Sequence, residues 1–152
     1  MKKLVLLLLL VVLIAGCIQL RPLRREVYDT SEQVLAERDP AIARALAARA
    51  KREEARGILA KDPALARDLG IGRPDLHKGS DDGGLVDLNA ADAATIARVC
   101  EIPPVTAQAV VRGREARGGT YFNVAESFVD VDLPPDVQDR LRDRAVVYDS
   151  QF

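Results

Sequence analysis

The chain has 152 residues and a near-balanced charge, with 22 Lys and Arg against 23 Asp and Glu, and aromatic residues make up only 4% of it. A chain of this length has room for one compact domain with accessory segments, but not for two sizeable cores. Scarce aromatics, no Trp and abundant Ala and Arg disfavour an all-β protein and predict an all-α fold.

The N-terminus predicts a membrane-targeting segment. Two lysines precede an uncharged apolar run from Leu4 to Ala15, and Gly16 and Cys17 close it. This order resembles a bacterial lipoprotein signal. The resemblance implies that residues 1–17 carry the signal, that Cys17 is lipidated on its thiol and becomes the first residue after cleavage, and that the protein is held by lipid on the extracytoplasmic side of a bacterial membrane.

An uncleaved anchor is the alternative reading of the same segment. The stretch from Leu4 to Leu20 only just reaches the usual range of roughly 17 to 25 residues for a membrane-spanning helix. Basic residues lie on both sides of it, so their distribution leaves the orientation open. In this alternative the domain could lie in the cytoplasm.

Residues 18–84 are interpreted as a helical spacer and linker. The phrase Asp-Pro-Ala-x-Ala-Arg-x-Leu occurs at 39–46 and again at 62–69, and each copy predicts a helix start, with Asp as the cap and Pro at the first helical position. We expect the first helix to run to about Arg56, where Gly57 interrupts it, and the second to end before Gly70. A Gly-, Ser- and Asp-rich linker follows.

The first of these helices carries five basic residues around a narrow apolar stripe. We interpret them as a solvated face paired with neighbouring glutamates, and a contact with anionic lipid or phosphate is the alternative. The residues are Arg44, Arg49, Lys51, Arg52 and Arg56.

The apolar spacing from residue 85 to 148 predicts two helical hairpins. Helices over 91–99 and up to 117 flank a break at 101–104, and a short helix over 123–128 and a last one over about 135–144 flank a break at 132–135. The side chains expected to fill the space between the first two helices are Ile96, Val99, Ile102, Val105, Val110 and Val111. Val137 and Leu141 are expected to point inward from the last helix.

The order of landmarks in this half resembles the helix-hairpin-helix family of the bacterial competence DNA receptor. The matching residues are Val86-Asp87-Leu88-Asn89, Pro104, Gly118-Gly119, Phe122, Val124 and Glu126. The resemblance implies a tandem helix-hairpin-helix domain over 85–148. In that family each hairpin is typically Gly-hydrophobic-Gly. Its glycines let a DNA phosphate approach backbone N–H groups at the start of the next helix, without base specificity.

The hairpins of this chain depart from that pattern. In place of Gly-hydrophobic-Gly, the chain has Glu101-Ile102-Pro103-Pro104 in the first hairpin and Asp132-Leu133-Pro134-Pro135 in the second. Only the central hydrophobic residue of the pattern is kept. Prolines have no N–H, and the two carboxylates occupy the place of an anion. The segment from residue 85 to 152 is also acidic, with 7 basic against 11 acidic residues, a net of −4.

Two functions therefore stay open, and both are non-catalytic. The module is expected to be a protein-interaction scaffold at the membrane; the alternative is a lipoprotein that binds duplex DNA without sequence preference. In the alternative, the candidate phosphate contacts are Arg112, Arg114, Arg117, Arg140, Arg142 and Arg144.

No constellation in the sequence predicts an enzyme. We find no paired nucleophile and base, no metal-ligand spacing and no Gly-rich nucleotide loop, so we expect no catalytic residue, metal, cofactor or small-molecule substrate. His77, the single histidine, is expected in a surface loop, and Cys100 is expected to be a small buried hydrophobe. The expected partners are thus the membrane and either a protein or double-stranded DNA.

Overall fold

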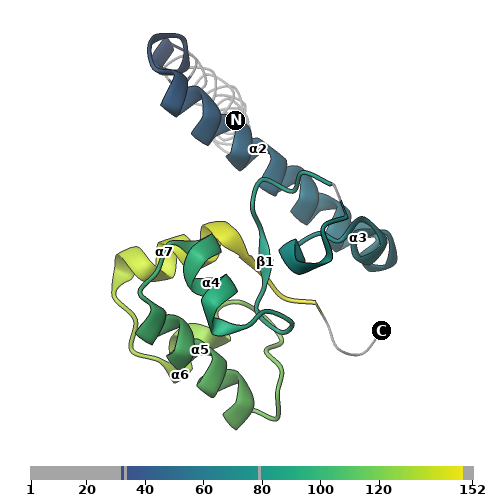
Figure 1. Cartoon of the computed structure of the whole chain (residues 1–152), viewed down its shortest axis with the longest axis vertical. Coiled ribbons are helices and arrows are strands. Elements are labelled where there is room, and N and C mark those ends of the chain that lie inside the picture. Colours follow the sequence, from purple (N-terminus) through teal and green to yellow (C-terminus); the bar gives the residue numbers. More distant parts are fainter. Residues whose placement is uncertain (1–31, 33, 79, 149–152) are drawn as a thin grey trace, which may run out of the picture. The chain divides into compact units, whose positions relative to one another are not determined.

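The computed structural model describes residues 32, 34–78 and 80–148, and it is mostly helical, in agreement with the predicted all-α class (Figure 1). The chain divides into two compact units, Met1–Leu46 and Ala47–Phe152, which we consider separately. The signal segment and Cys17 lie outside the described residues. Across the described ranges, no helix combines the length and the apolar character that crossing a membrane requires.

Helix α2 (Pro40–Lys61) starts at the predicted aspartate–proline pair, where a side-chain oxygen of Asp39 accepts the amide N–H of Ala41 at 2.7 Å. It does not end near Arg56, so the prediction that Gly57 interrupts it was wrong. A glycine inside a helix costs only about 1 kcal/mol relative to alanine. Ala55 and Ile58, on either side of Gly57, pack into a core, and this packing outweighs the cost.

Helix α3 (Pro63–Leu69) confirms the second predicted helix. Asp62 accepts the N–H of Leu65 at 2.9 Å, and Gly70 ends the helix in the left-handed conformation, at φ 73°. A 3-10 turn, η1 (Pro74–Leu76), follows. His77 is exposed in the loop after it, as predicted.

Hydrogen bonds hold the segment that was predicted as a linker in a defined conformation. One side-chain oxygen of Asp82 accepts the N–H of Gly72 (2.7 Å), and the other accepts those of Gly84 (3.0 Å) and Leu85 (3.2 Å). The carbonyl oxygen of Gly83 accepts from Arg52. A Cβ atom on Gly83 would lie 2.2 Å from the carbonyl oxygen of Ala48, so the loop approaches α2 as closely as only glycine allows.

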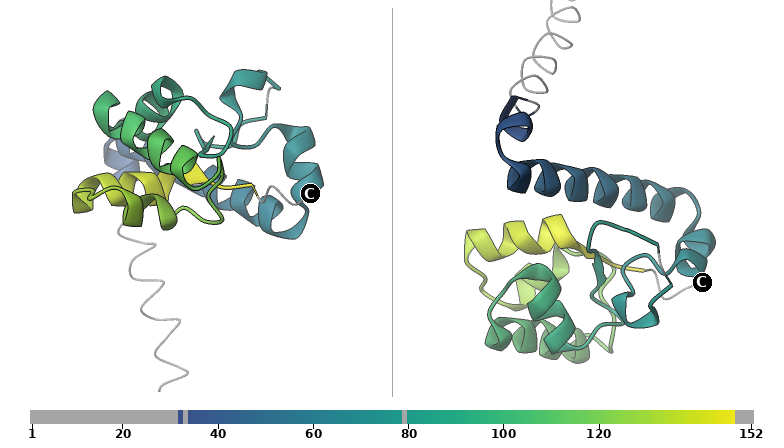
Figure 2. Two further views of the ribbon diagram at one scale, coloured as in Figure 1. Left: turned by 90° about the horizontal axis from the view of Figure 1, so that it is seen from below. Right: turned by 45° about the horizontal axis from the view of Figure 1, so that its top comes forward.

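The C-terminal half consists of two helix pairs closed by a short parallel strand pair. α4 (Ala93–Cys100) and α5 (Pro104–Ala116) form the first pair, and α6 (Glu126–Asp130) and α7 (Pro135–Arg144) form the second (Figures 1 and 2). β1 (Val86–Asp87) pairs with β2 (Ala145–Val146), with Val86 opposite Ala145. The strand pair, which the sequence did not predict, joins the beginning of the module to its end.

Two apolar clusters fill this unit. The larger one lies among the four helices and includes Ile96, Ile102, Val110, Val137 and Leu141, in agreement with the prediction. Val105 was predicted to join it but is 67% exposed, because the first turn of α5 points its side chain outward. The smaller cluster brings Ala55, Ala66 and Ile71 from the predicted spacer against Leu85, Val146 and Tyr148.

Cys100 is fully buried within the larger cluster, as predicted. Burial raises the pKa of its thiol to about 12, because the charged thiolate is poorly solvated there, and Arg144 offsets only part of this effect. The thiol therefore stays protonated and behaves as an apolar side chain.

Candidate interaction site: the two hairpins

The first hairpin is a tight turn between α4 and α5. Glu101 adopts the left-handed conformation (φ 54°, ψ 42°), and its N–H and that of Ile102 both donate to the carbonyl oxygen of Ala97. Ile102 is buried, whereas Pro103 and Pro104 are exposed. Only the central hydrophobic residue therefore serves the core, and the other three form the tip.

The second hairpin, between α6 and α7, has the same pattern of burial but enters the turn through an extended Val131 (φ −130°, ψ 123°) in place of a left-handed residue. Leu133 is buried while Asp132, Pro134 and Pro135 are exposed. The side-chain amide of Gln138 donates to the carbonyl oxygen of Leu133 at 2.9 Å and fixes the turn to α7. Each hairpin thus presents one acid and two prolines to solvent.

The helix starts behind both tips offer few N–H donors. Pro103 and Pro104, like Pro134 and Pro135, have none. The amides of Thr106 and Ala107 already donate to the carbonyl oxygen of Pro103, at 3.0 and 3.1 Å. The amides of Val137 and Gln138 donate to that of Pro134 in the same way, both at 3.0 Å. Within the described residues, each first turn keeps one amide without a bond, that of Val105 or Asp136.

Two of the predicted phosphate contacts bind the first hairpin instead. Arg144 donates through Nη1 to the carbonyl oxygen of Val99 (2.9 Å) and to Oε1 of Glu101 (2.7 Å). Arg140 donates to the carbonyl oxygen of Glu101 at 2.5 Å. These cations satisfy free carbonyl groups at the C-terminal end of α4, where the helix dipole favours positive charge.

The other four arginines differ in their surroundings. Arg114 donates to the carbonyl oxygens of Leu88 (2.6 Å) and Ala91 (2.9 Å), so it supports the start of the module. Arg117 pairs with Glu126 at 3.9 Å, and Arg142 pairs with Asp139 at 3.0 Å while its guanidinium covers the ring of Phe128. Among the six, and within the described chain, only Arg112 has no polar partner.

Asn89 holds the base of the two hairpins together. Its Nδ2 donates to the carbonyl oxygens of Tyr121 (2.9 Å) and Tyr148 (3.0 Å), and its Oδ1 accepts the N–H of Tyr121 (2.7 Å). Asp87, two residues earlier, accepts the amides of Asn89 (3.0 Å) and Tyr148 (3.4 Å). Burial raises the pKa of Asp87, and the two hydrogen bonds from these amides oppose that rise.

Two residues of α2 have a role that the sequence did not reveal. Arg52, interpreted as part of a solvated face, is 7% exposed. Its Nη2 and Nε bind the two carboxylate oxygens of Asp143 at 2.8 and 3.3 Å. Arg56 donates to the carbonyl oxygens of Arg142 and Asp143, and burial lowers its pKa despite the nearby Asp143. The second half of α2 therefore lies beside α7, as the right-hand view of Figure 2 shows.

The only feature of the sequence that could have indicated this role is the spacing of the two arginines, which are four residues apart and flank Ala55.

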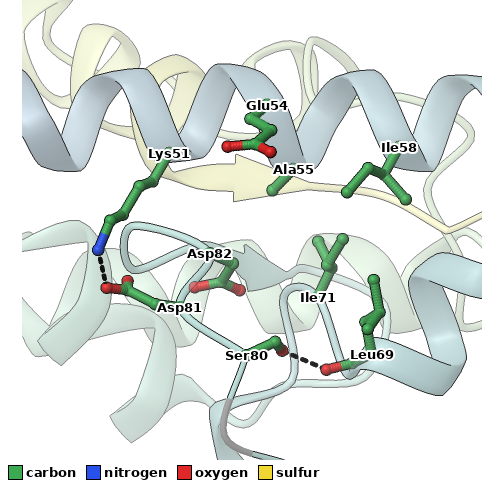
Figure 3. Close-up of a pocket in the computed structure, with 9 residues that line it drawn as sticks. All are labelled: Lys51, Glu54, Ala55, Ile58, Leu69, Ile71, Ser80, Asp81 and Asp82. Carbon is green, nitrogen blue, oxygen red and sulfur yellow. Dashed lines mark hydrogen bonds and ion pairs between the residues drawn. The ribbon is translucent and has the colours of Figure 1, made fainter.

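A small, open hollow lies between α2, the end of α3 and the loop before β1 (Figure 3). Its floor is apolar, formed by Ala55, Ile58, Leu69 and Ile71. At its rim, Lys51 pairs with Asp81 and the Ser80 hydroxyl donates to the carbonyl oxygen of Leu69. Lys51 therefore neutralises Asp81, and the Ser80 hydroxyl is bound to the main chain.

Across the ranges that the structure describes, no three His, Cys, Asp or Glu side chains are placed to hold a metal ion. Neither a family model, nor a curated protein, nor a solved structure matches this chain.

Proposed function

We propose that residues 85–148 form a tandem helix-hairpin-helix domain that acts as a non-catalytic protein-interaction scaffold, attached to a bacterial membrane through lipidated Cys17. Two features support the domain assignment: each helix pair turns around a single buried hydrophobic residue, Ile102 or Leu133, and Glu101 adopts the left-handed conformation that glycine favours. Asn89, one of the residues that carry the resemblance to the family, is bonded to the middle of the module at Tyr121 and to its end at Tyr148, and this also supports the assignment.

The observation that carries the functional proposal is the shortage of free backbone N–H groups at the two hairpin tips. Four prolines remove N–H groups at the two tips, and the next two amides of each helix already donate to Pro103 or Pro134. A hydrogen bond to a charged group contributes about 1.5 to 3 kcal/mol, so the loss of two such donors weakens phosphate binding by roughly two decades or more. Carboxylates at both tips add repulsion.

The arginines do not make up for this loss. Arg140, Arg144 and Arg114 donate to backbone carbonyl groups of the fold, and freeing them for a phosphate would leave those carbonyls unsatisfied. Of the six candidates, and within the described residues, only Arg112 has no polar partner. A surface made in this way favours a protein over a nucleic acid as partner.

The test is a titration of labelled duplex DNA with the full chain in neutral detergent, followed by fluorescence anisotropy at low and physiological salt. We expect no binding at micromolar protein, even at low salt. Micromolar binding that weakens steeply with salt, because phosphate contacts release counterions, would instead establish the DNA-binding alternative. The variant Arg112→Ala would then show whether this arginine carries it.

The proposed anchor has its own test. Cells that express the wild-type chain or Cys17→Ala are labelled with a palmitate analogue, and we expect label only on the wild type. An unlabelled wild-type chain that stays in the membrane fraction would favour the uncleaved anchor.

A further inference from the structure

A second, partly enclosed cavity lies where the predicted spacer meets the hairpin module. Its volume is about 180 Å³, smaller than the roughly 300 to 1,000 Å³ of pockets for drug-sized ligands. It therefore has room for one small group, such as the end of a side chain. The residues that line it come from α3, from η1 and the position before it, from β1 and from the end of the module, and they are Arg67, Arg73, Leu76, Asp87 and Tyr148.

The carboxylate of Asp87 offers an unused acceptor to this cavity. Asp87 is 4% exposed, and its Oδ1 accepts the N–H groups of Asn89 and Tyr148. Its Oδ2 has no hydrogen-bond partner among the described residues, and none of their unpartnered side-chain oxygens is closed off from solvent. Because Asp87 lines the cavity, Oδ2 opens into it. Burial raises the pKa of Asp87, and a further donor at Oδ2 would stabilise its charged form.

An unused donor belongs to the same lining. Nε and Nη2 of Arg73 donate to the two carboxylate oxygens of Asp75, at 2.9 and 2.8 Å. The Nη1 atom of Arg73 has no partner within the described part of the chain. The hydrogen bond with Asp75 raises the pKa of Arg73, and the charge of Asp87 adds to this rise, so the two groups act on each other. The cavity thus combines an acceptor and a donor that the fold does not use.

Tyr148 and Leu76 add apolar surface. The Tyr148 hydroxyl donates to the carbonyl oxygen of Ile71 at 2.8 Å, which fixes the ring, and the guanidinium of Arg67 lies 5.6 Å from the ring centroid. Leu76 is 42% exposed, so it lies at the mouth of the cavity. A group that enters therefore meets apolar surface as well as the two polar atoms.

The charges of the lining select a neutral ligand. A cation would be repelled by the guanidinium groups of Arg67 and Arg73, and an anion by the carboxylate of Asp87. A primary amide is neutral and carries both complementary groups. Its N–H can donate to Oδ2 of Asp87, and its carbonyl oxygen can accept from Nη1 of Arg73. This is the side-chain chemistry of asparagine and glutamine.

We propose that this cavity is a binding site for a primary amide, presented by a protein partner as the side chain of an asparagine or glutamine. Exposed Leu76 and the Arg73–Asp75 ion pair beside the cavity offer further contacts to the surface around that side chain. An anchor that fills a desolvated pocket is typical of hot spots in protein interfaces. Among the described residues, the site shares none with the hairpin tips, so it goes beyond the function proposed for them.

The experiment is an NMR titration of the isotope-labelled full chain in neutral detergent. The probes share one apolar body and differ in the polar group: isobutyramide, isobutyrate, isobutylammonium and isobutanol. We expect isobutyramide to shift the amide resonances of Asn89 and Tyr148, which donate to the other oxygen of Asp87, with a Kd on the order of 1 to 10 mM. The amides of Ala107 and Val137 in the hairpins should not shift. The other three probes should bind at least tenfold more weakly.

A substitution at Asp87 should reverse this preference. Asp87→Asn keeps an oxygen for the amides of Asn89 and Tyr148, but it presents an NH2 group to the cavity and removes the negative charge. We expect this variant to bind isobutyrate in preference to isobutyramide, a reversal that a general loss of structure would not produce. The control Asp68→Asn, at an exposed site on α3, should keep the preference for the amide.

A second variant tests the donor. Arg73→Ala should weaken the binding of isobutyramide roughly tenfold, because the carbonyl oxygen of the amide loses a charged hydrogen-bond donor. Arg98→Ala, at an exposed site on α4, should leave the binding unchanged. Thermal melts verify that each variant is folded.

The remaining arm identifies the source of the amide. Glutamine capped at both ends represents a residue within a protein and should shift the same resonances. Tighter binding of free glutamine would overturn the protein partner in favour of a small metabolite. No shift with isobutyramide, equal binding of the four probes, or a preference of the wild type for isobutyrate would overturn the amide site. None of these results bears on the hairpin tips, whose proposed function is tested by the anisotropy titration.

Discussion

Single residues decide how the two hairpins are held, and Asn89 is the clearest case. Its amide group makes three hydrogen bonds to the main chain at Tyr121 and Tyr148, so one side chain connects the start, the middle and the end of the module. We expect Asn89→Ala to lower the free energy of unfolding by about 2 to 4 kcal/mol, because half-buried backbone groups lose their partners. Urea unfolding measures this, with exposed Gln108→Ala as control. A loss below that of the control variant would contradict the role given to Asn89.

Asp87 gives a prediction for pH. Burial raises its pKa above the ordinary value of 3.8, so the folded protein holds this proton at a pH where the unfolded chain has lost it. The contribution of Asp87 to stability therefore falls as pH rises from about 3.8 through the raised pKa. Asp87→Asn keeps an oxygen acceptor but does not titrate. We expect the wild type to lose stability relative to this variant across that window, and a constant difference between them would contradict the assignment.

Two neighbouring glycines separate steric crowding from backbone strain. Gly83 (φ 70°) and Gly84 (φ 81°) both have left-handed backbones, but only at Gly83 would a Cβ meet other atoms within 4 Å. Gly84→Ala should therefore cost only the strain of about 1 to 2 kcal/mol. Gly83→Ala should cost clearly more, because the loop has to move away from α2. Equal losses in thermal unfolding would mean that this close approach does not form.

At the level of elements, the interaction of α2 with α7 depends on Arg52. This guanidinium is buried, but the carboxylate of Asp143 is partly exposed, so we expect less than the 3 to 5 kcal/mol typical of breaking a fully buried pair. Arg52→Ala should cost about 2 kcal/mol in chemical unfolding, whereas Arg98→Ala, at an exposed site on α4, should stay within roughly 0.5 kcal/mol of the wild type. A neutral Arg52→Ala would return this arginine to the solvated face that the sequence suggested.

The elements also show what local sequence can and cannot predict. Helix starts at Asp62 and at the two hairpins were predictable, because capping residues and prolines act on their immediate neighbours. The burial of Arg52 depends on Asp143, 91 positions away, and the continuation of α2 through Gly57 depends on a cluster that includes Val146 and Tyr148. Helical spacing predicted that Val105 lies in the core. Spacing alone does not show that this residue belongs to the first turn of α5, where its side chain is exposed. The acid and proline tips were identified from the sequence, but the left-handed conformation of Glu101 was not.

At the scale of the molecule, the compact unit that contains the hairpins begins at Ala47, within α2. Leu85, Val146 and Tyr148 are buried partly by Ala55, Ala66 and Ile71, and the Tyr148 hydroxyl donates to the carbonyl oxygen of Ile71 at 2.8 Å. Small domains bury a low fraction of their surface, so the loss of one cluster weighs heavily. We therefore expect a fragment of residues 85–152 to unfold at a much lower temperature than one of residues 47–152, or not to fold at all.

Circular dichroism melts and amide NMR spectra of the two fragments test this prediction. The fragment of residues 47–152 should give a cooperative melt and well-dispersed resonances. Adding Arg52→Ala to it should bring its melting temperature toward that of the shorter fragment, because the ion pair with Asp143 is one of the contacts that the shorter fragment lacks. If residues 85–152 alone melt at the same temperature as residues 47–152, the smaller cluster and the contacts of α2 contribute nothing to the stability of the hairpins, and the second half of α2 belongs to a spacer after all.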